Sequence, residues 1–402
     1  MEYKYSNRKI RIIILIMFFM NIGFYMLIPY LSVYLTDSFG LAGIIVGFIM
    51  AIRLFSQQGL TFVGGAIADK IGIRKTIIIG TVIRSIGFLL FGVSNGMYLL
   101  ILAAVFTGFG GALFTPATRT ALTLYSSDDK IKKKTFSTLN IADNSALALG
   151  PLIGLVLIQY NWAIISIVSS MIYLIAGIVA YLIINKSLEN INSSSSTSIL
   201  SNMAHVLKQR TFILTIAVTI PYFYTAQQVY LLFPVVSERI NETWLVSLGF
   251  LIIALTVVVG QKPLDKIMHK FITNDYKRII VGYLVLCVFI FPNVFIVNKY
   301  TLILFIMGVA FSIIIIGPTI NVLVTKFSTP KTLSSFFGFS TLSAAIGGAF
   351  GNLFAGALID LITISSLNFV PWLIILITNI FSVLFIYSYF IRKQRTSRLI
   401  GL

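Results

Sequence analysis

The chain has 402 residues, of which 58% are hydrophobic and 10% are charged. Its mean hydropathy of +0.97 indicates too little polar surface to cover a water-soluble globule of this length, whereas a lipid bilayer tolerates an apolar exterior. The composition therefore argues against a soluble enzyme, and the formal net charge of +18 must be explained by where the basic residues fall.

Twelve apolar segments are each long enough to cross a bilayer as a helix, which takes about 20 residues. We predict spans at residues 10–35, 42–67, 76–94, 98–121, 137–159, 162–184, 212–235, 244–262, 278–297, 301–325, 334–358 and 370–391. They predict an all-α integral membrane protein. A long polar interruption with a serine run from Ser193 to Ser196 is typical of a flexible linker. We therefore expect a six-helix bundle at 1–185, a cytosolic linker at 186–211 and a second six-helix bundle at 212–402.

Lysines and arginines gather in the two tails and in every second loop between the predicted spans. By the positive-inside rule these segments are cytosolic, so we expect both termini in the cytosol and a multi-pass protein of the cytoplasmic membrane. The basic charge then reflects topology, and no nucleic-acid partner is expected. Cys287, His205 and His269 form no metal-ligand set by spacing, so we expect neither a metal site nor a cofactor.

The two halves resemble each other in sequence. Tyr25 to Pro29 lies in the first predicted span, and Tyr230 to Pro234 lies at the matching place in the seventh. In later spans Gly108 corresponds to Gly308. Such a repeat is typical of carriers built from two pseudo-symmetric bundles, which bind a substrate between them near the bilayer midplane and expose it to each side in turn.

Charged residues inside predicted spans are functional candidates, because each costs roughly 2.5–3.5 kcal/mol to insert. Asp143 is the sole carboxylate within a predicted span, and we assign it to proton coupling together with Arg119. The alternative is a permanent ion pair between these two residues. Arg53, followed one turn later by Gln57, is assigned to substrate binding, with an arginine bonded to backbone carbonyls as the alternative. Arg84 is expected to be structural.

Two stripes of uncharged polar side chains are also assigned to the substrate cavity. They are Asn21 and Tyr25 in the first span, and Tyr224, Gln227, Gln228 and Tyr230 in the seventh. These side chains supply hydrogen bonds and stacking without a fixed charge, as a small-molecule site requires. The alternative is that neighbouring helices satisfy them.

The predicted loop after the second span contains Gly65-Ala66-Ile67-Ala68-Asp69-Lys70-Ile71-Gly72-Ile73-Arg74-Lys75. This run resembles the G-x-L-A-D-R-x-G-R-K signature of the major facilitator superfamily (MFS), whose fold has twelve transmembrane helices in two bundles. The resemblance implies a cytosolic gating motif formed by Gly65, Asp69, Gly72, Arg74 and Lys75. It also implies that Asp69 meets the start of the eleventh span near Ser334 and Ser335.

Gly150-Pro151-Leu152-Ile153-Gly154 in the fifth span resembles the core of the antiporter motif of the 12-helix drug:proton antiporter family. Ala146 and Leu155 stand where that motif has its outer glycines. The first part of the chain, including the runs from Val46 to Arg53 and from Arg84 to Phe88, is similar to the MdtH-like branch of the same family. These resemblances imply proton-driven export of a small molecule.

The charge inventory then discriminates between classes of cargo. Arg53 lies centrally, Asp143 lies towards the cytosol, and the second half offers no acid in mid-span. This favours an anionic or zwitterionic metabolite, such as an opine-type metallophore similar to staphylopine. The alternatives are a polyspecific multidrug efflux pump and an uptake symporter. The expected partners are the small-molecule substrate, protons and the lipid bilayer, and we expect a monomer.

Overall fold

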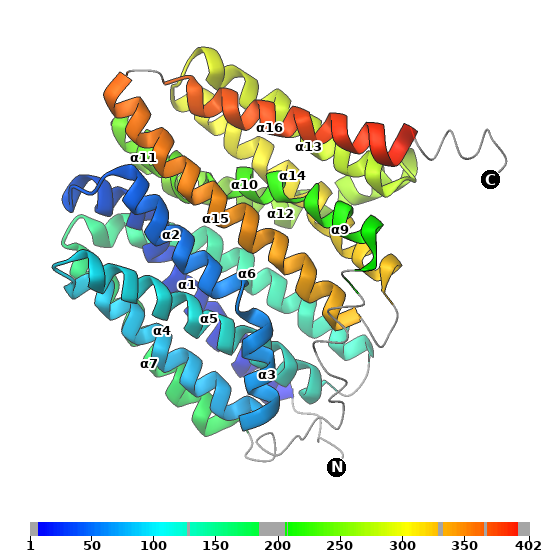
Figure 1. Cartoon of the computed structure of the whole chain (residues 1–402). Helices are drawn as coiled ribbons and strands as arrows, with labels where there is room; N and C mark the ends of the chain where they lie inside the picture. Colours follow the sequence, from blue (N-terminus) through cyan, green and yellow to red (C-terminus); the bar gives the residue numbers. More distant parts are fainter. Residues whose placement is uncertain are drawn as a thin grey trace. The chain divides into compact units, whose positions relative to one another are not determined.

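The computed structural model describes residues 7–126, 129–184, 206, 208–328, 333–365 and 368–392. Every regular element in these ranges is a helix (Figure 1). Twelve of the helical segments are long and apolar enough to cross a membrane: Asn7–Ser38, Gly43–Ala68, Ile73–Val93, Met97–Tyr125, Lys134–Ile158, Trp162–Ile183, Arg210–Arg239, Trp244–Met268, Asp275–Phe295, Lys299–Phe327, Phe339–Ile362 and Val370–Ile391. These are the twelve predicted spans, and the all-α membrane fold is confirmed.

The chain divides into two compact units. Unit 1 comprises residues 1–40 and 48–196, and unit 2 comprises residues 41–47 and 197–402. The predicted linker at 186–211 lies mostly outside the described residues, so the predicted domain boundaries stay a prediction.

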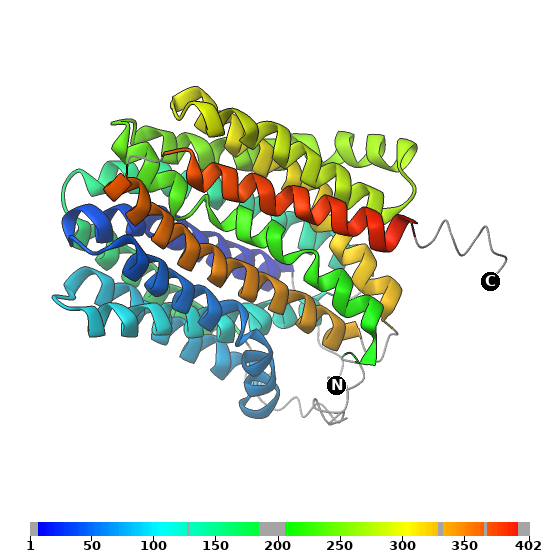
Figure 2. The same ribbon diagram turned by 45° about the horizontal axis from the view of Figure 1, so that its top comes forward.

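The helices of the first half are α1 (Asn7–Val33), α2 (Gly43–Gln58), α3 (Thr61–Ile71), α4 (Ile73–Val93), α5 (Met97–Tyr125), α6 (Asp129–Ile158) and α7 (Trp162–Ile183), with a short π-helix η1 (Tyr34–Ser38) after α1. Within unit 1, α4 packs on both α5 and α7, and α1 packs on both α6 and α7 (Figure 1 and Figure 2).

The helices of the second half are α9 (Arg210–Ala217), α10 (Ile220–Gln227), α11 (Leu232–Arg239), α12 (Trp244–Phe271), α13 (Asp275–Phe295), α14 (Lys299–Phe327), α15 (Leu333–Ser365) and α16 (Val370–Ile386), followed by a short π-helix η3 (Tyr387–Arg392). Within unit 2, α13 packs on both α14 and α16, and α10 packs on α15. These pairings repeat those of α4 with α5 and α7 and of α1 with α6, as a pseudo-symmetric repeat requires.

Two predicted spans are interrupted by non-helical residues. The span at 42–67 consists of α2 and α3, and the span at 212–235 consists of α9, α10 and α11. Proline removes a backbone donor and its ring clashes with the carbonyl four residues earlier. Pro221 and Pro234 therefore disturb the helix at residues 217 and 230, close to the two breaks. Pro29, at the matching position in the first half, lies inside the unbroken helix α1.

The region around the predicted gating motif also differs from the expected loop. Helix α3 continues to Ile71, so Asp69 lies within a helix, and α4 starts at Ile73 immediately afterwards. The connection is Gly72, whose φ of 93° is unfavourable for residues that have a side chain. In the second half, Asp265 also lies inside a helix, the long α12. The motif is therefore a sharp corner between two helices.

Small residues let α6 lie directly against α1. A Cβ atom at Gly154 would overlap the carbonyl oxygen of Met26, and one at Gly150 would lie 2.6 Å from Cβ of Tyr25. At the same interface the Tyr30 hydroxyl donates a hydrogen bond to the carbonyl of Pro151 at 2.9 Å. Gly150, Pro151 and Gly154 of the antiporter-like motif thus lie in the contact between these two helices.

The start of α2 belongs to unit 2 because α15 holds it there. The carboxylate of Asp360 accepts hydrogen bonds from the backbone N–H groups of Gly43 at 2.6 Å and Ile44 at 2.8 Å. These donors belong to the first turn of α2, where an anion also interacts favourably with the helix dipole.

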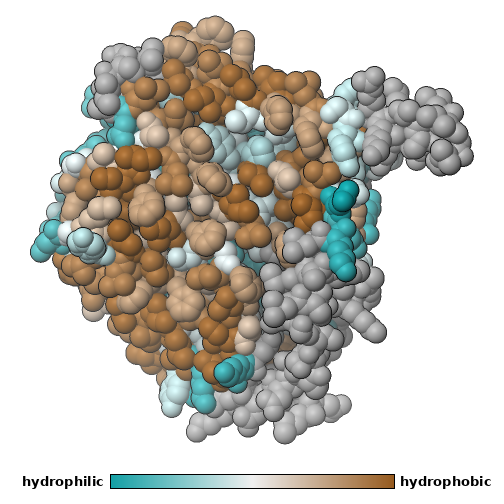
Figure 3. Space-filling model, in the orientation of Figure 1, coloured by the Kyte–Doolittle hydropathy of each residue, from teal (hydrophilic) through white to brown (hydrophobic). Residues whose placement is uncertain are grey.

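Apolar side chains dominate the visible surface, shown brown in Figure 3. Leu182 of α7 is 73% exposed, Val288 of α13 is 68% exposed and Phe381 of α16 is 66% exposed. Such residues destabilise a water-soluble protein but suit contact with lipid acyl chains. The surface therefore agrees with the twelve-span interpretation.

The tight contact between α1 and α6 gives a first prediction. Replacing Gly154 by Val is expected to lower the stability of the protein by about 1–3 kcal/mol, because overpacking forces the helices apart. Thermal unfolding of the purified protein in detergent measures this change. Gly317→Ala is the control, since a Cβ there meets no atom within 4 Å. Equal melting temperatures for Gly154→Val and the native protein would contradict the assigned packing.

Candidate functional site

The carboxylate of Asp143 lies at the interface between α6 and α1. It accepts a hydrogen bond from the side-chain amide Nδ2 of Asn21 at 2.7 Å, and both residues are half-buried. The side chain of Arg119, the predicted partner of Asp143, is exposed. In the described part of the chain the two residues form no ion pair, so the permanent Asp143–Arg119 pair offered as the alternative is not observed.

Arg53 and Gln57 of α2 contact each other one turn apart, as their spacing predicts. Nη1 of Arg53 donates to Oε1 of Gln57 at 3.2 Å. The Arg53 side chain is buried, and its guanidinium lies 5.3 Å from the centre of the Phe24 ring on α1. The ring of Tyr25, half-buried on the same helix, lies 5.1 Å from that of Phe24. Gly108 of α5 permits this arrangement, because a Cβ atom there would overlap the carbonyl oxygen of Arg53.

Arg84 of α4 lies in the same cluster, which the sequence did not predict. Its side chain is 3% exposed, and its Nε has no hydrogen-bond partner. The guanidinium carbon lies over four aromatic rings, those of Phe24 at 5.0 Å, Phe114 at 5.2 Å, Tyr173 at 5.2 Å and Phe88 at 5.8 Å. Arg84 is therefore a buried cation held mainly by aromatic rings.

Gly111 of α5 joins the two arginines into one cluster. A Cβ atom at this position would overlap Nη1 of Arg84 and would lie 3.3 Å from Cδ of Gln57. Both side chains thus pack on the backbone of α5 at this point. We call Phe24, Arg53, Gln57 and Arg84 the arginine cluster. The signal for this cluster in the sequence is an arginine, Arg84, within an apolar span, but the sequence analysis assigns that residue a structural role.

Arg74, from the predicted gating motif, has a clear structural role. Its Nε and Nη2 donate to the carbonyl oxygen of Tyr181 at 3.2 and 2.6 Å, and its guanidinium lies 4.3 Å from the centre of the Tyr181 ring. Tyr181 is in the last turn of α7, where carbonyl groups lack helical partners. Arg74 thereby fastens the start of α4 to the end of α7.

Only some of the other residues of the predicted gating motif have side chains that the structure describes. Lys75 is exposed, and Gly65 has open space where a side chain would be. The side chains of Asp69, Ser334 and Ser335 lie outside the described part of the chain. The predicted contact of Asp69 with the eleventh span therefore stays a prediction, and the side chains of His205 and His269 lie outside the description as well.

The polar stripe of the seventh span meets α15 at the break between α10 and α11. Nε2 of Gln228 donates to the carbonyl oxygens of Tyr224 at 2.9 Å and Gly351 at 3.2 Å. Tyr224 and Gln227 pack on Gly351 from the same side. Tyr230 points elsewhere, with its ring 5.3 Å from that of Phe250 on α12. Three of the four residues predicted in this stripe, Tyr224, Gln227 and Gln228, therefore contact α15 at Gly351.

Asn352 of α15 is a further polar residue at this place, and the sequence did not identify it. Its side chain is fully buried, yet neither Oδ1 nor Nδ2 has a hydrogen-bond partner among the described residues. The hydroxyl of Tyr224 and Oε1 of Gln228 are also buried without a partner there. Buried polar atoms normally have partners, so this part of the seventh span and α15 has hydrogen-bonding capacity that the described residues leave unused.

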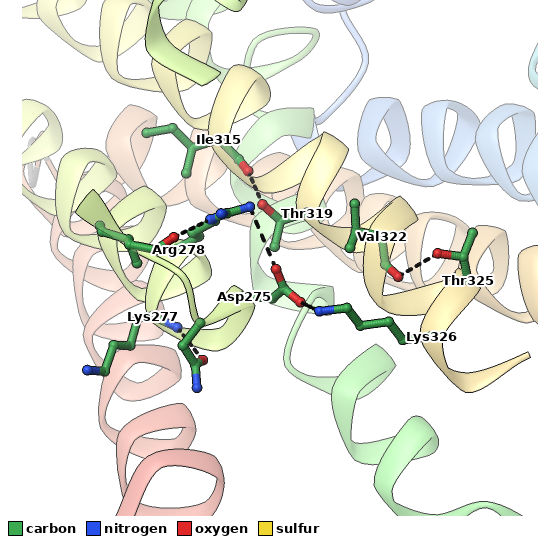
Figure 4. A network of polar contacts seen from close by, with 10 residues as sticks. Asp275, Lys277, Arg278, Ile315, Thr319, Val322, Thr325 and Lys326 are labelled. Carbon is green, nitrogen blue, oxygen red and sulfur yellow. Dashed lines mark hydrogen bonds and ion pairs between the residues drawn. The ribbon is translucent and has the colours of Figure 1, made fainter. Parts of the chain in front are cut away.

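The sequence also missed a network at the start of α13 (Figure 4). The carboxylate of Asp275 binds the ammonium group of Lys326 at the end of α14 and lies 3.7 Å from Nη1 of Arg278. Nε of Arg278 donates to the carbonyl oxygen of Ile272 at 2.7 Å. Like Arg74 in unit 1, Arg278 fixes a helix start through a backbone carbonyl, which marks the network as a structural brace.

A chain with twelve apolar spans and two similar bundles, and with buried polar clusters in each, has the architecture of a solute transporter. The family model described as "Major Facilitator Superfamily" matches residues 13–352. The chain therefore belongs to the major facilitator superfamily. It is a membrane transporter and not an enzyme, as the sequence predicted.

Related proteins indicate the branch of the superfamily to which the chain is similar. The chain is 30% identical over 379 residues to the "Multidrug resistance protein MdtH" of Blochmanniella pennsylvanica, covering 92% of this chain and 90% of that protein. It is 28% identical over 382 residues to MdtH of Yersinia pestis, covering 94% of each. An "Uncharacterized MFS-type transporter" of Mycobacterium tuberculosis is 31% identical over 366 residues, covering 88% of this chain and 86% of that protein. The expected MdtH-like branch is confirmed.

Solved structures support the fold alone. The nucleoside transporter NupG matches with a TM-score of 0.77 and 13% identity, covering 96% of this chain and 99% of that chain. A POT family transporter in complex with 5-aminolevulinic acid matches with a TM-score of 0.75 and 14% identity, covering 95% of this chain and 96% of that chain. Identity this low carries no information on the cargo.

Adjacent residues in the motif give a second prediction. Arg74→Gln is expected to lower stability by about 2 kcal/mol, because the hydrogen bonds from a charged group to the Tyr181 carbonyl are lost. Lys75→Gln, at the exposed neighbour, is the control and is expected to change stability by less than about 0.5 kcal/mol. Thermal unfolding in detergent compares the two. Equal effects would show that the contact with Tyr181 contributes nothing.

Proposed function

We propose that this transporter exports a small organic molecule in exchange for protons, by alternating access, with Asp143 as the proton carrier. The hydrogen bond between Asn21 and Asp143 carries the proposal. A carboxylate in a membrane span is costly unless it has a function or a partner, and this one has an uncharged partner. A neutral amide leaves the carboxylate free to gain and lose a proton, whereas a fixed ion pair with an arginine would oppose protonation.

The chemistry of Asn21 suits both protonation states. Its amide nitrogen donates to the ionised carboxylate, as observed at 2.7 Å. After a rotation of the side chain, its amide oxygen can accept from the protonated acid. The contact between α1 and α6 is thereby kept while the charge at Asp143 changes. The proposal keeps Arg119, whose side chain is exposed, as the cation that takes part with Asp143 in proton coupling.

The favoured cargo is an anionic or zwitterionic metabolite, with an opine-type metallophore similar to staphylopine as one example. Arg53 and Gln57 supply a cation and an amide in unit 1. Tyr224, Gln228 and the neighbouring Asn352 supply uncharged partners in unit 2. A cargo with a carboxylate suits the cation and amide of unit 1, and a lipophilic cation does not.

Polyspecific multidrug efflux is the second candidate, supported by the names of the MdtH relatives. Export distinguishes both candidates from an uptake symporter of the same fold. The antiporter-like motif supports export through the family resemblance. Gly150 and Gly154 themselves explain only the close contact of α6 with α1.

The role of Asp143 gives a third prediction. In inside-out membrane vesicles with an acidic lumen and an internal pH dye, adding the cargo is expected to release lumenal protons. Asp143→Asn is expected to abolish this release, because the amide cannot carry a proton. Asp37→Asn, an exposed carboxylate at the end of the first span, is the control and is expected to behave as the native protein. Undiminished release by Asp143→Asn would place the proton site elsewhere.

The cargo class gives a fourth prediction. In the same vesicles, carboxylate-rich metallophores are expected to release protons, and lipophilic cations such as ethidium are not. Arg53→Gln is expected to raise the apparent KM for the metallophore by about tenfold or more, the loss of one charge-assisted hydrogen bond, while Arg11→Gln, an exposed arginine near the start of α1, leaves it unchanged. Release by ethidium alone would favour multidrug efflux. Accumulation of the metallophore in intact expressing cells would instead indicate uptake.

A further inference from the structure

Arg84 is a buried charged residue of unit 1 that has no role in the transport cycle proposed above. Its side chain is 3% exposed. In the described part of the chain it makes no ion pair, and its Nε has no hydrogen-bond acceptor. Its guanidinium contacts four aromatic rings instead. Aromatic faces attract a cation, but they offer no oxygen atom to accept hydrogen bonds from its N–H groups.

Arg53 adds a second positive charge beside Arg84. Both guanidiniums lie over the Phe24 ring, at 5.0 Å for Arg84 and 5.3 Å for Arg53. Gln57 lies between them, bonded to Arg53 and packed on Gly111 beside Nη1 of Arg84. Two cations held together in an apolar bundle attract an anion.

We propose that Arg84 is a cargo-binding residue and that the arginine cluster is a site for a carboxylate group. This rests on the proposed function in that the carboxylate belongs to the exported molecule. The planar guanidinium fork of Arg84 matches a carboxylate in two parallel hydrogen bonds, which a lysine cannot do. The four aromatic rings hold the guanidinium in one orientation, and the Gln57 amide supplies a further donor.

The choice of a carboxylate over a bulkier anion follows from the packing. The guanidinium is enclosed by rings from α1, α4, α5 and α7, and the backbone of Gly111 packs directly on Nη1. A flat carboxylate needs less room beside the fork than a tetrahedral oxyanion, whose further oxygens face the apolar rings. The test must therefore separate carboxylates from inorganic oxyanions.

The experiment measures binding without any gradient. The purified protein in detergent is titrated with citrate, with trimethyl citrate as the uncharged match and with sulfate as the inorganic anion, and ligand-induced shifts in melting temperature are recorded. Citrate is expected to stabilise the native protein, and trimethyl citrate and sulfate are not. Arg84→Gln is expected to abolish the citrate shift, and Arg84→Lys is expected to weaken citrate binding by about tenfold or more, as the loss of the bidentate geometry implies.

Two further variants keep the test decisive. Gly111→Ala places a methyl group against Nη1 of Arg84 and is expected to weaken citrate binding while both arginines remain. Arg278→Gln removes a buried arginine of unit 2 and is expected to keep the citrate shift in full, measured against its own melting temperature. If Arg84→Gln fails to fold, Gly111→Ala and Arg84→Lys decide the question.

The opposing outcomes are equally specific. A citrate shift that persists in Arg84→Gln, or in both Arg84→Lys and Gly111→Ala, would overturn the site, and Arg84 would be a structural cation in an aromatic box. Equal stabilisation by sulfate would overturn the assignment to a carboxylate. Intact citrate binding together with a lack of proton-linked export would refute the proposed function and leave this site standing. Export that persists in Arg84→Gln would refute the site alone.

Discussion

The cost of placing charge inside an apolar bundle governs this structure. Each charged side chain in a membrane span costs roughly 2.5–3.5 kcal/mol to insert, so it persists only where neighbouring helices supply a partner. Three kinds of contact stabilise the charged side chains in this protein. Asp143 accepts an amide hydrogen bond from α1, Arg74 donates to a carbonyl at the end of α7, and Arg84 is enclosed by aromatic rings.

Each of these solutions depends on helices that approach one another closely. The Asn21–Asp143 bond requires α1 and α6 to touch, which Gly150 and Gly154 allow. The packing of Arg84 on α5 requires Gly111. In membranes, where the hydrophobic effect does not drive helices together, small residues at contacts supply much of the packing energy. The buried charges therefore depend on the glycines, because the glycines let the helices that carry the partner groups come close.

The sequence predicted the spans and the repeat because both depend on local properties, namely segment length, hydropathy and spacing. It also singled out Asp143, since a charge in an apolar segment is conspicuous. It could not predict whether Asp143 meets Asn21 or Arg119, because that depends on helix rotation, which hydropathy does not encode. Prolines show the same limit: Pro29 and Pro234 occupy matching places, yet α1 is continuous and the second-half segment is broken. Surrounding helices decide whether a proline ends a helix.

Helix α1 connects the two proposed events of transport within unit 1. Asn21, which donates a hydrogen bond to Asp143, precedes Phe24 by three residues, and residues so spaced lie on the same side of a helix. The Phe24 ring in turn lies against the guanidiniums of Arg53 and Arg84. One face of α1 therefore carries both the partner of Asp143 and the ring that packs on the two arginines, so a movement of this helix affects both proposed sites.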